Sequence, residues 1–456
     1  MIGFQRLKAL LIVFGDLLVF ELALFLSLWL RYGDLDFPRW ESNFLPFSVL
    51  SLVWVVCFYI IGLYNLTLLR EPVRLFRTYV EAMLANLVIG FGFFYLLPFG
   101  LTPRAVLLVH FSVSLLLGYA WRISAGRLIP ALFSRGRVLF VGPAEEVQRV
   151  DALLRDSALG LELVAAIATS GEPYRHADIK WANGLHAYSD MLKQEQINAV
   201  VLGVRPDDFP ELKKELYKSL FTPVTILDRA ELEEATTARI PLSHVTETWF
   251  LHHLKESEKT WYETAKRVAD ILLSLPFGLF TLAIMPFVFI ATKLSSPGPI
   301  FYTQSRVGKG GKLFTIVKFR SMRMDAEKNG AQFTQNAKTD PRLFGWGRFM
   351  RMTRIDELPQ VWNVLKGDLS FIGPRPERPE FTAPLEERMP HYALRHLTRP
   401  GLTGWAQVMF LTPTSSLEDN LKKLQYDLYY IKHRSLFLDA LILLRTVGIV
   451  LRRQGT

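Results

Sequence analysis

The sequence predicts a membrane protein in three parts: a four-helix transmembrane bundle, an α/β domain with a doubly wound parallel sheet, and a mainly α, membrane-associated domain. Half of the 456 residues are hydrophobic while 21% are charged, so apolar segments must alternate with parts that face water. Four long apolar runs fill residues 1–130. Strand-like and helix-like stretches alternate over residues 131–245, and a further apolar run opens the C-terminal part.

Each of the four N-terminal runs is near the roughly 20 residues that a spanning helix needs. The runs are 7–30, 44–64, 79–97 and 105–124. Asp16 and Glu21 interrupt the first run, and because carboxylates are costly in lipid we expect them to face other helices or an aqueous cavity. The first run carries these acids and lacks a small-residue cleavage site, which favours a retained helix over a signal peptide.

Basic residues then orient the bundle, because positive charge accumulates on the cytoplasmic side of membrane helices. They lie before the first run, between the second and third, and after the fourth: Arg6, Lys8, Arg70, Arg74, Arg77, Arg127, Arg135 and Arg137. This pattern predicts that both ends of the bundle face the cytoplasm.

The formal charge of +10 is typical of proteins that meet nucleic acid or an anionic membrane. No nucleic-acid-binding motif is present, so the charge favours a membrane and anionic substrates, with no nucleic acid as partner. The single cysteine, Cys57, excludes internal disulfides and cysteine-rich metal sites, and its apolar surroundings predict a packing role.

The stretch 131–245 is predicted to form a doubly wound, Rossmann-like domain, because strands at 137–142, 163–169, 199–203 and 224–228 are separated by helix-like segments. The turn after the first strand has few glycines and places Glu145 and Glu146 where a phosphate would sit. A scaffold or dimerisation role is therefore favoured over nucleotide binding, and we expect a homodimer. The chain turns polar over 231–259, and a linker is predicted at 246–262. The histidines of the polar stretch, His244, His252 and His253, are expected at the surface, not in a metal site.

The C-terminal part, 263–456, opens with an apolar run at 268–292 that is long enough to span. Basic residues flank both of its ends, which conflicts with a simple crossing. Pro276 and Pro286 lie inside the run and would bend it. Two interpretations stay open from the residues alone, a kinked span and a re-entrant helix that enters and leaves on one face. Short strands at 301–304 and 313–318 then suggest a plain hairpin, and the apolar stretch 436–451 suits either the membrane interface or a buried core.

Asp356 and Glu357 open a predicted short helix, with Asp356 as its N-cap and Gly367 as its stop signal. The positive end of the helix dipole would keep Asp356 ionised and draw a phosphate to it. A carboxylate nucleophile beside a phosphate site is what attack on a phosphoanhydride needs. The alternative is a plain capping box in which Thr353 is the cap.

Four motifs follow one another in the C-terminal part. They are Lys318-Phe319-Arg320-Ser321-Met322, Asp356-Glu357-Leu358-Pro359-Gln360, Gly373-Pro374-Arg375-Pro376 and the run 399–408. In this order they resemble the bacterial sugar transferase family, the polyprenyl-phosphate sugar-1-phosphate transferases. The resemblance covers the chain from about Lys266 onward, and the N-terminal half is similar to that of the family's larger members. A fragment from about Trp261 is accordingly expected to keep the chemistry.

The resemblance implies that a sugar-1-phosphate passes from a nucleotide diphosphate sugar, a UDP-hexose, to undecaprenyl phosphate, with release of UMP, as the initiating step of exopolysaccharide, capsule or O-antigen synthesis. Asp356 would form a covalent aspartyl-phosphosugar intermediate, with Glu357 assisting. Mg²⁺ is the expected cofactor, with Asp356 as its protein ligand. Arg375 and Arg399 match family arginines that suit phosphate contacts. Further substrate-binding candidates are Lys318, Arg320, Arg351, Asp368 and Asp427.

The resemblance also favours the re-entrant interpretation of 268–292, with a break at Pro286, although Met285 stands where the family often has serine. The expected location is the bacterial inner membrane, with several crossings and the catalytic domain on the cytoplasmic face. Two other functions stay open: a conventional membrane glycosyltransferase that releases a nucleoside diphosphate, and an inactive assembly scaffold.

Overall fold

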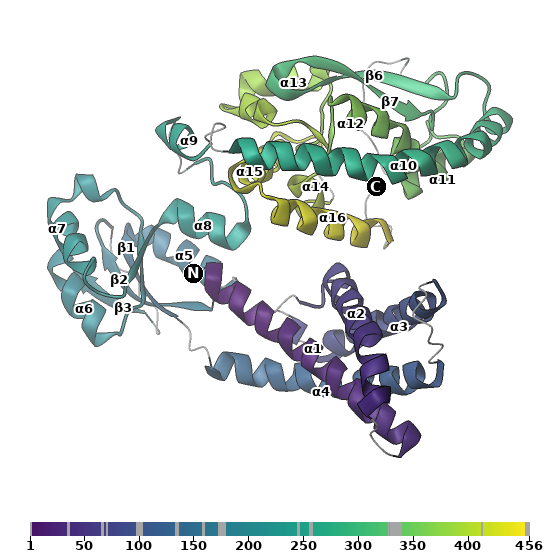
Figure 1. The fold of residues 1–456 in the computed structure, drawn as a ribbon. Coiled ribbons are helices and arrows are strands. Elements are labelled where there is room, and N and C mark those ends of the chain that lie inside the picture. The colour runs from purple at the N-terminus through teal and green to yellow at the C-terminus, as the bar shows by residue number, and fades with distance from the viewer. Residues whose placement is uncertain are drawn as a thin grey trace. The chain divides into compact units, whose positions relative to one another are not determined.

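The computed structural model divides the chain into two compact units, Met1–Thr237 and Ala238–Thr456 (Figure 1). It describes residues 2–33, 37–64, 68–69, 72–96, 104–132, 136–156, 160–171, 179–243, 247–254, 259–326, 328, 340–411 and 414–451. Arg70, Arg135 and His244, which entered the sequence analysis, lie outside the described residues, as do the side chains of Arg6 and Lys8. The expected boundaries at 131, 246 and 263 stay predictions.

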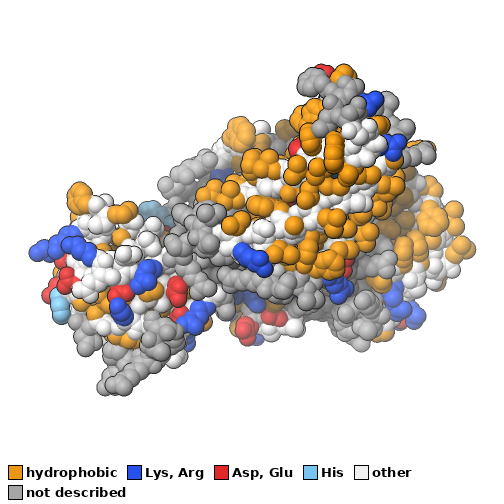
Figure 2. Space-filling view, turned by 90° about the horizontal axis from the view of Figure 1, so that it is seen from below, with side chains coloured by type: hydrophobic (Ala, Val, Ile, Leu, Met, Phe, Trp, Pro, Cys, Tyr) orange, Lys and Arg blue, Asp and Glu red, His pale blue; other side chains and the backbone are white. Residues whose placement is uncertain are grey.

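The first unit begins with four long helices: α1 (Ile2–Tyr32), α2 (Phe37–Ile61), α3 (Pro72–Leu96) and α4 (Arg104–Leu132). Each contains 23 or 24 residues that are apolar enough to cross a membrane, and α10 (Thr260–Ser295) of the second unit is a fifth such helix. Figure 2 shows hydrophobic side chains spread over the outer surface of the bundle. Together these helices support a membrane protein and confirm the four helices expected at the N-terminus.

A buried ion pair joins the first and last helices of the bundle. Nη2 of Arg122 on α4 lies 2.6 Å from Oδ2 of Asp16 on α1, and neither side chain is more than 1% exposed. Glu21 accepts a hydrogen bond of 2.8 Å from Ser48 on α2. Because an unpaired charge is costly in this environment, both acids face other helices as expected. Arg122 was not predicted as the partner of Asp16.

The first unit continues with a five-stranded parallel sheet in the order β3-β2-β1-β4-β5. Its strands are β1 (Gly136–Gly142), β2 (Leu161–Ala168), β3 (Lys180–Asn183), β4 (Ala199–Leu202) and β5 (Thr225–Asp228). Successive side chains of β1 point to opposite faces, so Val138 and Phe140 pack with helices α5 and α8 while Leu139 and Val141 pack with α6 and α7. The covering helices are α5 (Val147–Asp156), α6 (Tyr188–Gln194), α7 (Pro210–Ser219) and α8 (Arg229–Thr237), with short 3₁₀ turns at Ala144–Glu146, Leu185–Ala187 and Pro206–Asp208.

The parallel sheet confirms the expected α/β layering, while its assignment as Rossmann-like stays a prediction. The expectation of four strands was wrong, because β3 was missed. This edge strand is only four residues long and begins with a lysine, so it carries little of the apolar signal that marks a buried strand.

The second unit packs helices around a hairpin and a two-stranded parallel sheet. Its elements are α9 (Glu247–His253), α10 (Thr260–Ser295), β6 (Phe301–Val307), a 3₁₀ turn at Lys309–Gly311, β7 (Leu313–Phe319), α11 (Gly345–Thr353), the 3₁₀ helix η7 (Ile355–Gln360), α12 (Val361–Lys366), β8 (Ser370–Ile372), α13 (Pro379–Arg388), η8 (Tyr392–Leu397), β9 (Gly401–Thr403), α14 (Trp405–Met409), α15 (Leu417–His433) and α16 (Leu436–Leu451). The antiparallel pairing of β6 with β7 confirms the predicted hairpin.

Helix α10 is continuous through both of its prolines. The expected break at Pro286 is therefore not an interruption of the helix, since a proline removes one backbone bond and a helix can absorb that loss by bending. Its apolar side chains remain widely exposed, including Leu279 at 71% and Leu294 at 84%. Such a surface suits lipid, and the re-entrant course stays a prediction.

Residues 238–243 and 247–254, here called the strap, belong to the second unit. The backbone N–H of Ile240 donates to the carbonyl of Gln425, and Nε1 of Trp405 donates to the carbonyl of Ala238, at 3.1 and 2.9 Å. Ile240, Phe250 and Leu254 are buried in the same hydrophobic core as Tyr392 and Leu424. Part of the region expected as a linker is thus a packed element, although its His252 and His253 are exposed as predicted.

Candidate functional site

The site is built on strand β7 and the 3₁₀ helix η7, which pack against each other. Asn363, at the start of α12, clamps the two together: its Nδ2 donates to the carbonyl of Thr315, and its Oδ1 accepts from the backbone of Val317. Both partners lie on β7, just before Lys318. The clamp therefore fixes the side chain of Lys318 relative to the carboxylates of η7.

A left-handed residue, Arg354, ends α11 and starts η7 with φ of 61°. Asp356 consequently lies in the first turn of a 3₁₀ helix and makes no cap hydrogen bond, so its prediction as an N-cap was wrong. The capping-box alternative also fails, because Thr353 Oγ1 donates back to the carbonyls of Phe349 and Met350. Non-glycine residues seldom adopt positive φ, so the left-handed conformation of Arg354 could not be predicted from the sequence. The stop at Gly367, with φ of 96°, was predicted correctly.

Glu357 is held by three cations. Its Oε1 lies 3.0 Å from Nζ of Lys318, 3.2 Å from Nη2 of Arg375 and 3.7 Å from Nη1 of Arg354. Burial raises the pKa of Glu357, but the three cations outweigh burial and hold this pKa well below its usual range. Glu357 is therefore a fixed negative charge that aligns Lys318 and Arg375.

Asp356 is in a different electrostatic state from its neighbour. It is 6% exposed, and burial followed by repulsion from Glu357 raises its pKa to about 6 against the opposing pull of Lys318 and Arg351. The expectation that a helix dipole favours its ionised form is thus outweighed, because η7 is short and the carboxyl group is buried. Its Oδ1 is buried and has no hydrogen-bond partner among the described residues. An unpartnered carboxylate oxygen of this kind is available for a metal ion or a reacting atom.

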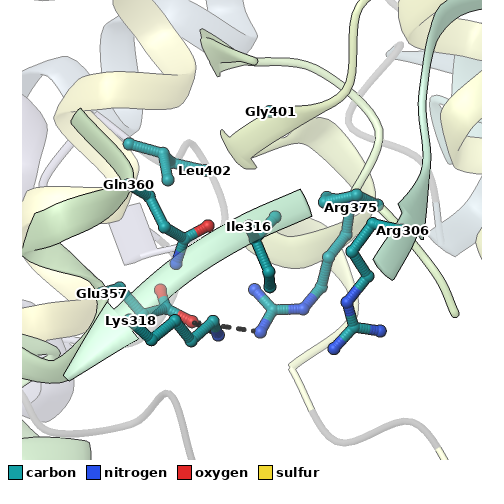
Figure 3. A pocket seen from close by; sticks show the side chains of 9 residues that line it. Arg306, Ile316, Lys318, Glu357, Gln360, Arg375, Gly401 and Leu402 are labelled. Atoms are coloured by element: carbon teal, nitrogen blue, oxygen red, sulfur yellow. Dashed lines mark hydrogen bonds and ion pairs between the residues drawn. The ribbon is translucent and has the colours of Figure 1, made fainter. Parts of the chain in front are cut away.

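An open pocket of about 270 Å³ lies beside these carboxylates (Figure 3). It is lined by Arg306, Ile316, Lys318, Glu357, Gln360, Arg375, Pro376, Gly401 and Leu402. Figure 3 shows Arg375 between Glu357 on one side and Arg306 on the other. The pocket therefore offers three cationic side chains around one carboxylate, which suits a ligand with several negative charges.

Close backbone packing brings the third and fourth motifs together at this pocket. In the parallel pair β8–β9, the N–H of Gly373 donates to the carbonyl of Thr403, and the N–H of Gly401 donates to the carbonyl of Pro374, both at 2.9 Å. A Cβ atom on Gly401 would lie 2.1 Å from the nitrogen of Gly373. Glycine is required here by the close approach, which sets Arg375 at the edge of the pocket.

Comparison with known proteins identifies the second unit. The family model described as bacterial sugar transferase matches residues 261–453. Over 329 residues the chain is 31% identical to the UDP-glucose:undecaprenyl-phosphate glucose-1-phosphate transferase of Xanthomonas campestris pv. campestris, covering 70% of this chain and 67% of that protein. The chain belongs to the bacterial sugar transferase family. This confirms the resemblance noted in the sequence.

Other members of the bacterial sugar transferase family are similar over shorter stretches. The chain is 40% identical over 260 residues to the UDP-N-acetylgalactosamine-undecaprenyl-phosphate N-acetylgalactosaminephosphotransferase of Aeromonas hydrophila, covering 57% of this chain and 60% of that protein. It is 41% identical over 184 residues to the UDP-glucose:undecaprenyl-phosphate glucose-1-phosphate transferase of Escherichia coli, covering 40% of this chain and 39% of the relative. These names are those of phosphoglycosyl transferases, the enzyme class expected from the sequence.

In this bacterial sugar transferase the predicted site residues fall into two groups. Lys318, Glu357 and Arg375 line the pocket, with Asp356 next to them in η7. Arg351 lies 3.8 Å from Asp340 and contributes positive charge near Asp356. The other predicted residues, Arg320, Asp368, Arg399 and Asp427, are not among the described residues that line the pocket.

Two of these other residues have evident structural partners. Arg320 is 4% exposed and donates to the carbonyls of Ser296 and Pro299, which fixes the chain at the end of α10. The carboxylate of Asp368 lies 3.1 Å from Nζ of Lys366, just after helix α12 ends. A structural role explains Arg320 better than substrate contact does.

Asp427 acts on the pocket through a residue that the sequence analysis missed. Its Oδ2 lies 2.8 Å from Nη2 of Arg395, and the same nitrogen donates to the carbonyl of Arg375 at 3.1 Å. Arg395 also donates to the hydroxyl of Tyr392. The Asp427–Arg395 pair is therefore placed to hold the backbone of Arg375.

Arg306 and Gln360 also line the pocket and were not predicted from the sequence, although Gln360 belongs to the same motif as Glu357.

Proposed function

We propose that the chain transfers a sugar-1-phosphate from a nucleoside diphosphate sugar, a UDP-hexose, to undecaprenyl phosphate, with release of UMP, as the initiating step of a bacterial polysaccharide. The observation that carries the proposal is the buried, unpartnered Oδ1 of Asp356 beside the cations of the pocket. The names of the relatives supply the donor and acceptor classes. The chain spans 60% of the Aeromonas protein and 67% of the Xanthomonas protein.

In the proposed reaction, Oδ1 of Asp356 attacks the β-phosphorus of the donor. The bond from that phosphorus to the bridging oxygen breaks, and the nucleoside monophosphate leaves with the electron pair. The acyl phosphate that remains is attacked at phosphorus by an oxygen of undecaprenyl phosphate, which restores the Asp356 carboxylate. A covalent intermediate splits one difficult displacement into two easier ones. Lys318 and Arg375, which are aligned by Glu357, would offset the charge on the phosphates.

The donor set at the site fits Mg²⁺ in part. The Asp356 carboxylate has two hard oxygens, so Oδ2 would hold the ion while Oδ1 attacks, and Mg²⁺ is commonly held by one or two carboxylates plus substrate phosphates. Among the described residues, however, no three His, Cys, Asp or Glu side chains are grouped as a metal site. Asp356 would hold the ion together with the substrate, and the bound ion would supply further charge neutralisation.

The membrane arrangement is part of the proposal. Helix α10 has exposed apolar side chains along its length and basic residues on both flanks, which supports a helix that enters and leaves on the cytoplasmic face of the bacterial inner membrane. Cysteines introduced near Lys266 and Lys309 should both be labelled from the cytoplasm. Labelling from opposite sides would show that α10 crosses. The homodimer expected from the α/β domain also remains a proposal.

The covalent step is tested with labelled UDP-sugar in the absence of undecaprenyl phosphate. Wild type should release UMP in a burst of about one per site and retain label that hydroxylamine removes. Asp356→Asn should give neither. Label on the variant, or an active wild type without a burst, would exclude Asp356 as the nucleophile. Release of UDP would indicate a conventional glycosyltransferase, and no turnover with any nucleotide sugar would support the scaffold alternative.

A further inference from the structure

Two arginines of the pocket lie side by side, and only one of them has an acidic partner there. Arg375 is 3.2 Å from Glu357, whereas Arg306 donates through Nη2 to the neutral amide oxygen of Gln304, at 2.7 Å. No carboxylate among the described residues forms an ion pair with Arg306. The Nε atom of Arg306 is buried and has no hydrogen-bond partner among the residues that the structure describes. The guanidinium of Arg306 therefore has unused hydrogen-bonding capacity next to the pocket.

The fold holds Arg306 in this position. The N–H of Val307, the next residue of β6, donates to the carbonyl of Glu377 at 3.0 Å, so β6 is tied to the segment that carries Arg375. The amide of Gln304 then holds the guanidinium from its own strand. The two arginines cannot move far apart without breaking these backbone and side-chain bonds.

Placing two guanidinium groups together has an electrostatic cost. Burial, followed by repulsion from Arg375, lowers the pKa of Arg306 to about 10 despite the opposing attraction of Glu377, and this still leaves the side chain charged at neutral pH. Glu357 is already shared by Lys318 and Arg375 and cannot neutralise a further cation. An anion bound between the two arginines would relieve the repulsion and use the free donors of Arg306. Guanidinium groups match phosphate oxygens in pairs of parallel hydrogen bonds.

We propose that Arg306 and Arg375 form a phosphate-binding subsite, separate from the phosphorus that Asp356 attacks, in which Arg306 is a substrate-binding residue. This inference rests on the proposed function, in which two phosphate groups besides the transferred one enter the site. One is the nucleoside-linked phosphate of the donor, which leaves as UMP, and the other is the phosphate of undecaprenyl phosphate. Arg375 then contacts Glu357 on one side and shares the bound phosphate with Arg306 on the other (Figure 3).

The test uses the full-length protein in lipid nanodiscs with Arg306→Gln and Arg306→Lys. Lys309→Gln is the matched control, because Lys309 is an exposed cation at the tip of the same hairpin. Binding of UMP is measured by calorimetry without turnover, and KM is measured separately for donor and acceptor. Loss of charge-assisted hydrogen bonds should weaken binding about 10- to 100-fold in Arg306→Gln. Arg306→Lys should recover part of this loss, and Lys309→Gln should match wild type.

The two phosphate sources give different results. If the subsite takes the donor phosphate, Arg306→Gln weakens UMP binding and raises the donor KM while the acceptor KM is unchanged. If it takes the acceptor phosphate, only the KM for undecaprenyl phosphate rises. The subsite is refuted if the folded variant matches Lys309→Gln in UMP binding and in both KM values. Should Arg306→Gln fail to fold, Arg306→Lys decides by the same measurements. UMP binding is scored without catalysis, so a wild type that binds UMP but does not turn over refutes the proposed function and leaves the subsite standing.

Discussion

The strap gives the sharpest test of how the second unit is held together. Ile240 is fully buried, and its side chain packs in the core that contains Tyr392 and Leu424. Truncation of a buried isoleucine to alanine costs about 2–5 kcal/mol, because the transfer free energy is lost and a cavity remains. For a unit of this size, 1 kcal/mol shifts Tm by about 2–4 °C. Ile240→Ala should therefore lower Tm by roughly 4 °C or more, by these two scales.

Deleting the whole strap should destabilise the second unit more than the single substitution does. A fragment that begins at Trp261 lacks Ile240, Phe250 and Leu254, and each such side chain contributes about 1.5–3 kcal/mol when it is fully buried. The sum, about 5–9 kcal/mol, is comparable with the whole stability of an ordinary domain. The fragment also leaves Nε1 of Trp405 without its partner carbonyl. A fragment that begins at Ala238 should fold and keep activity, whereas one that begins at Trp261, the start expected from the sequence, should not.

Thermal unfolding in detergent, followed by circular dichroism and by activity after heating, measures both perturbations. Leu251→Ala is the matched control, because Leu251 lies on the same helix α9 as Phe250 but is 76% exposed. Its Tm should equal that of wild type. Equal Tm values for Ile240→Ala and Leu251→Ala, or equal Tm and activity for the fragments from Ala238 and Trp261, would show that the strap does not stabilise the second unit.

Four further predictions concern buried charges. Because the pKa of Asp356 is raised from 3.8 to about 6 on folding, its ionisation begins to oppose folding above pH 3.8, and the cost is complete above about pH 6. Asp356→Asn should therefore have a higher Tm than wild type at pH 8, with a gap that closes as the pH falls below 6, and a gap independent of pH would contradict this origin. Wild-type turnover should rise as the pH increases through about 6, because the carboxylate is the attacking form, and a flat profile of kcat/KM would count against it. Asp427→Asn removes the nearer carboxylate of Arg395 and leaves only Glu377, at 3.9 Å. The loss should cost less than the roughly 3–5 kcal/mol of a buried charge left wholly unpaired. Tm should fall, and the folded enzyme should have a lower kcat because Arg375 is less firmly held, whereas an unchanged kcat would refute the positioning role. Arg320→Met should lower Tm without changing the donor KM of the folded fraction, and a raised KM would instead place Arg320 in the pocket.

The architecture was predictable where the signal is local. Long apolar runs identified the four N-terminal helices, and short apolar strands around a glycine-rich turn identified the β6–β7 hairpin. Edge strand β3 escaped because its burial is partial and its length is four residues. The ion pair between Asp16 and Arg122 escaped for a different reason, since it joins residues from opposite ends of the bundle sequence.

The site residues, too, were predictable only where a local sequence motif marks them. Motifs in the sequence located Lys318, Asp356, Glu357 and Arg375, all of which the structure brings together. The electrostatic state of Asp356 could not be derived, because the left-handed turn at Arg354 and the burial of η7 depend on tertiary packing. Arg306 is placed by the bond from the next residue, Val307, to the carbonyl of Glu377, and Arg395 is placed by its ion pair with Asp427. The spacing of residues within one segment cannot predict contacts between segments that are far apart in the sequence.

The glycines that seat β8 against β9 have a consequence for how mutational data on this enzyme should be interpreted. Gly373, Gly401 and Gly404 each face neighbouring backbone at a distance that no side chain can occupy. A saturation scan scored by activity alone would rank them with Asp356, although none of them has a functional group to offer the reaction. Scoring protein abundance in parallel would separate the two kinds of intolerance, since a glycine variant should be depleted from the membrane while Asp356→Asn accumulates there as an inert, folded protein.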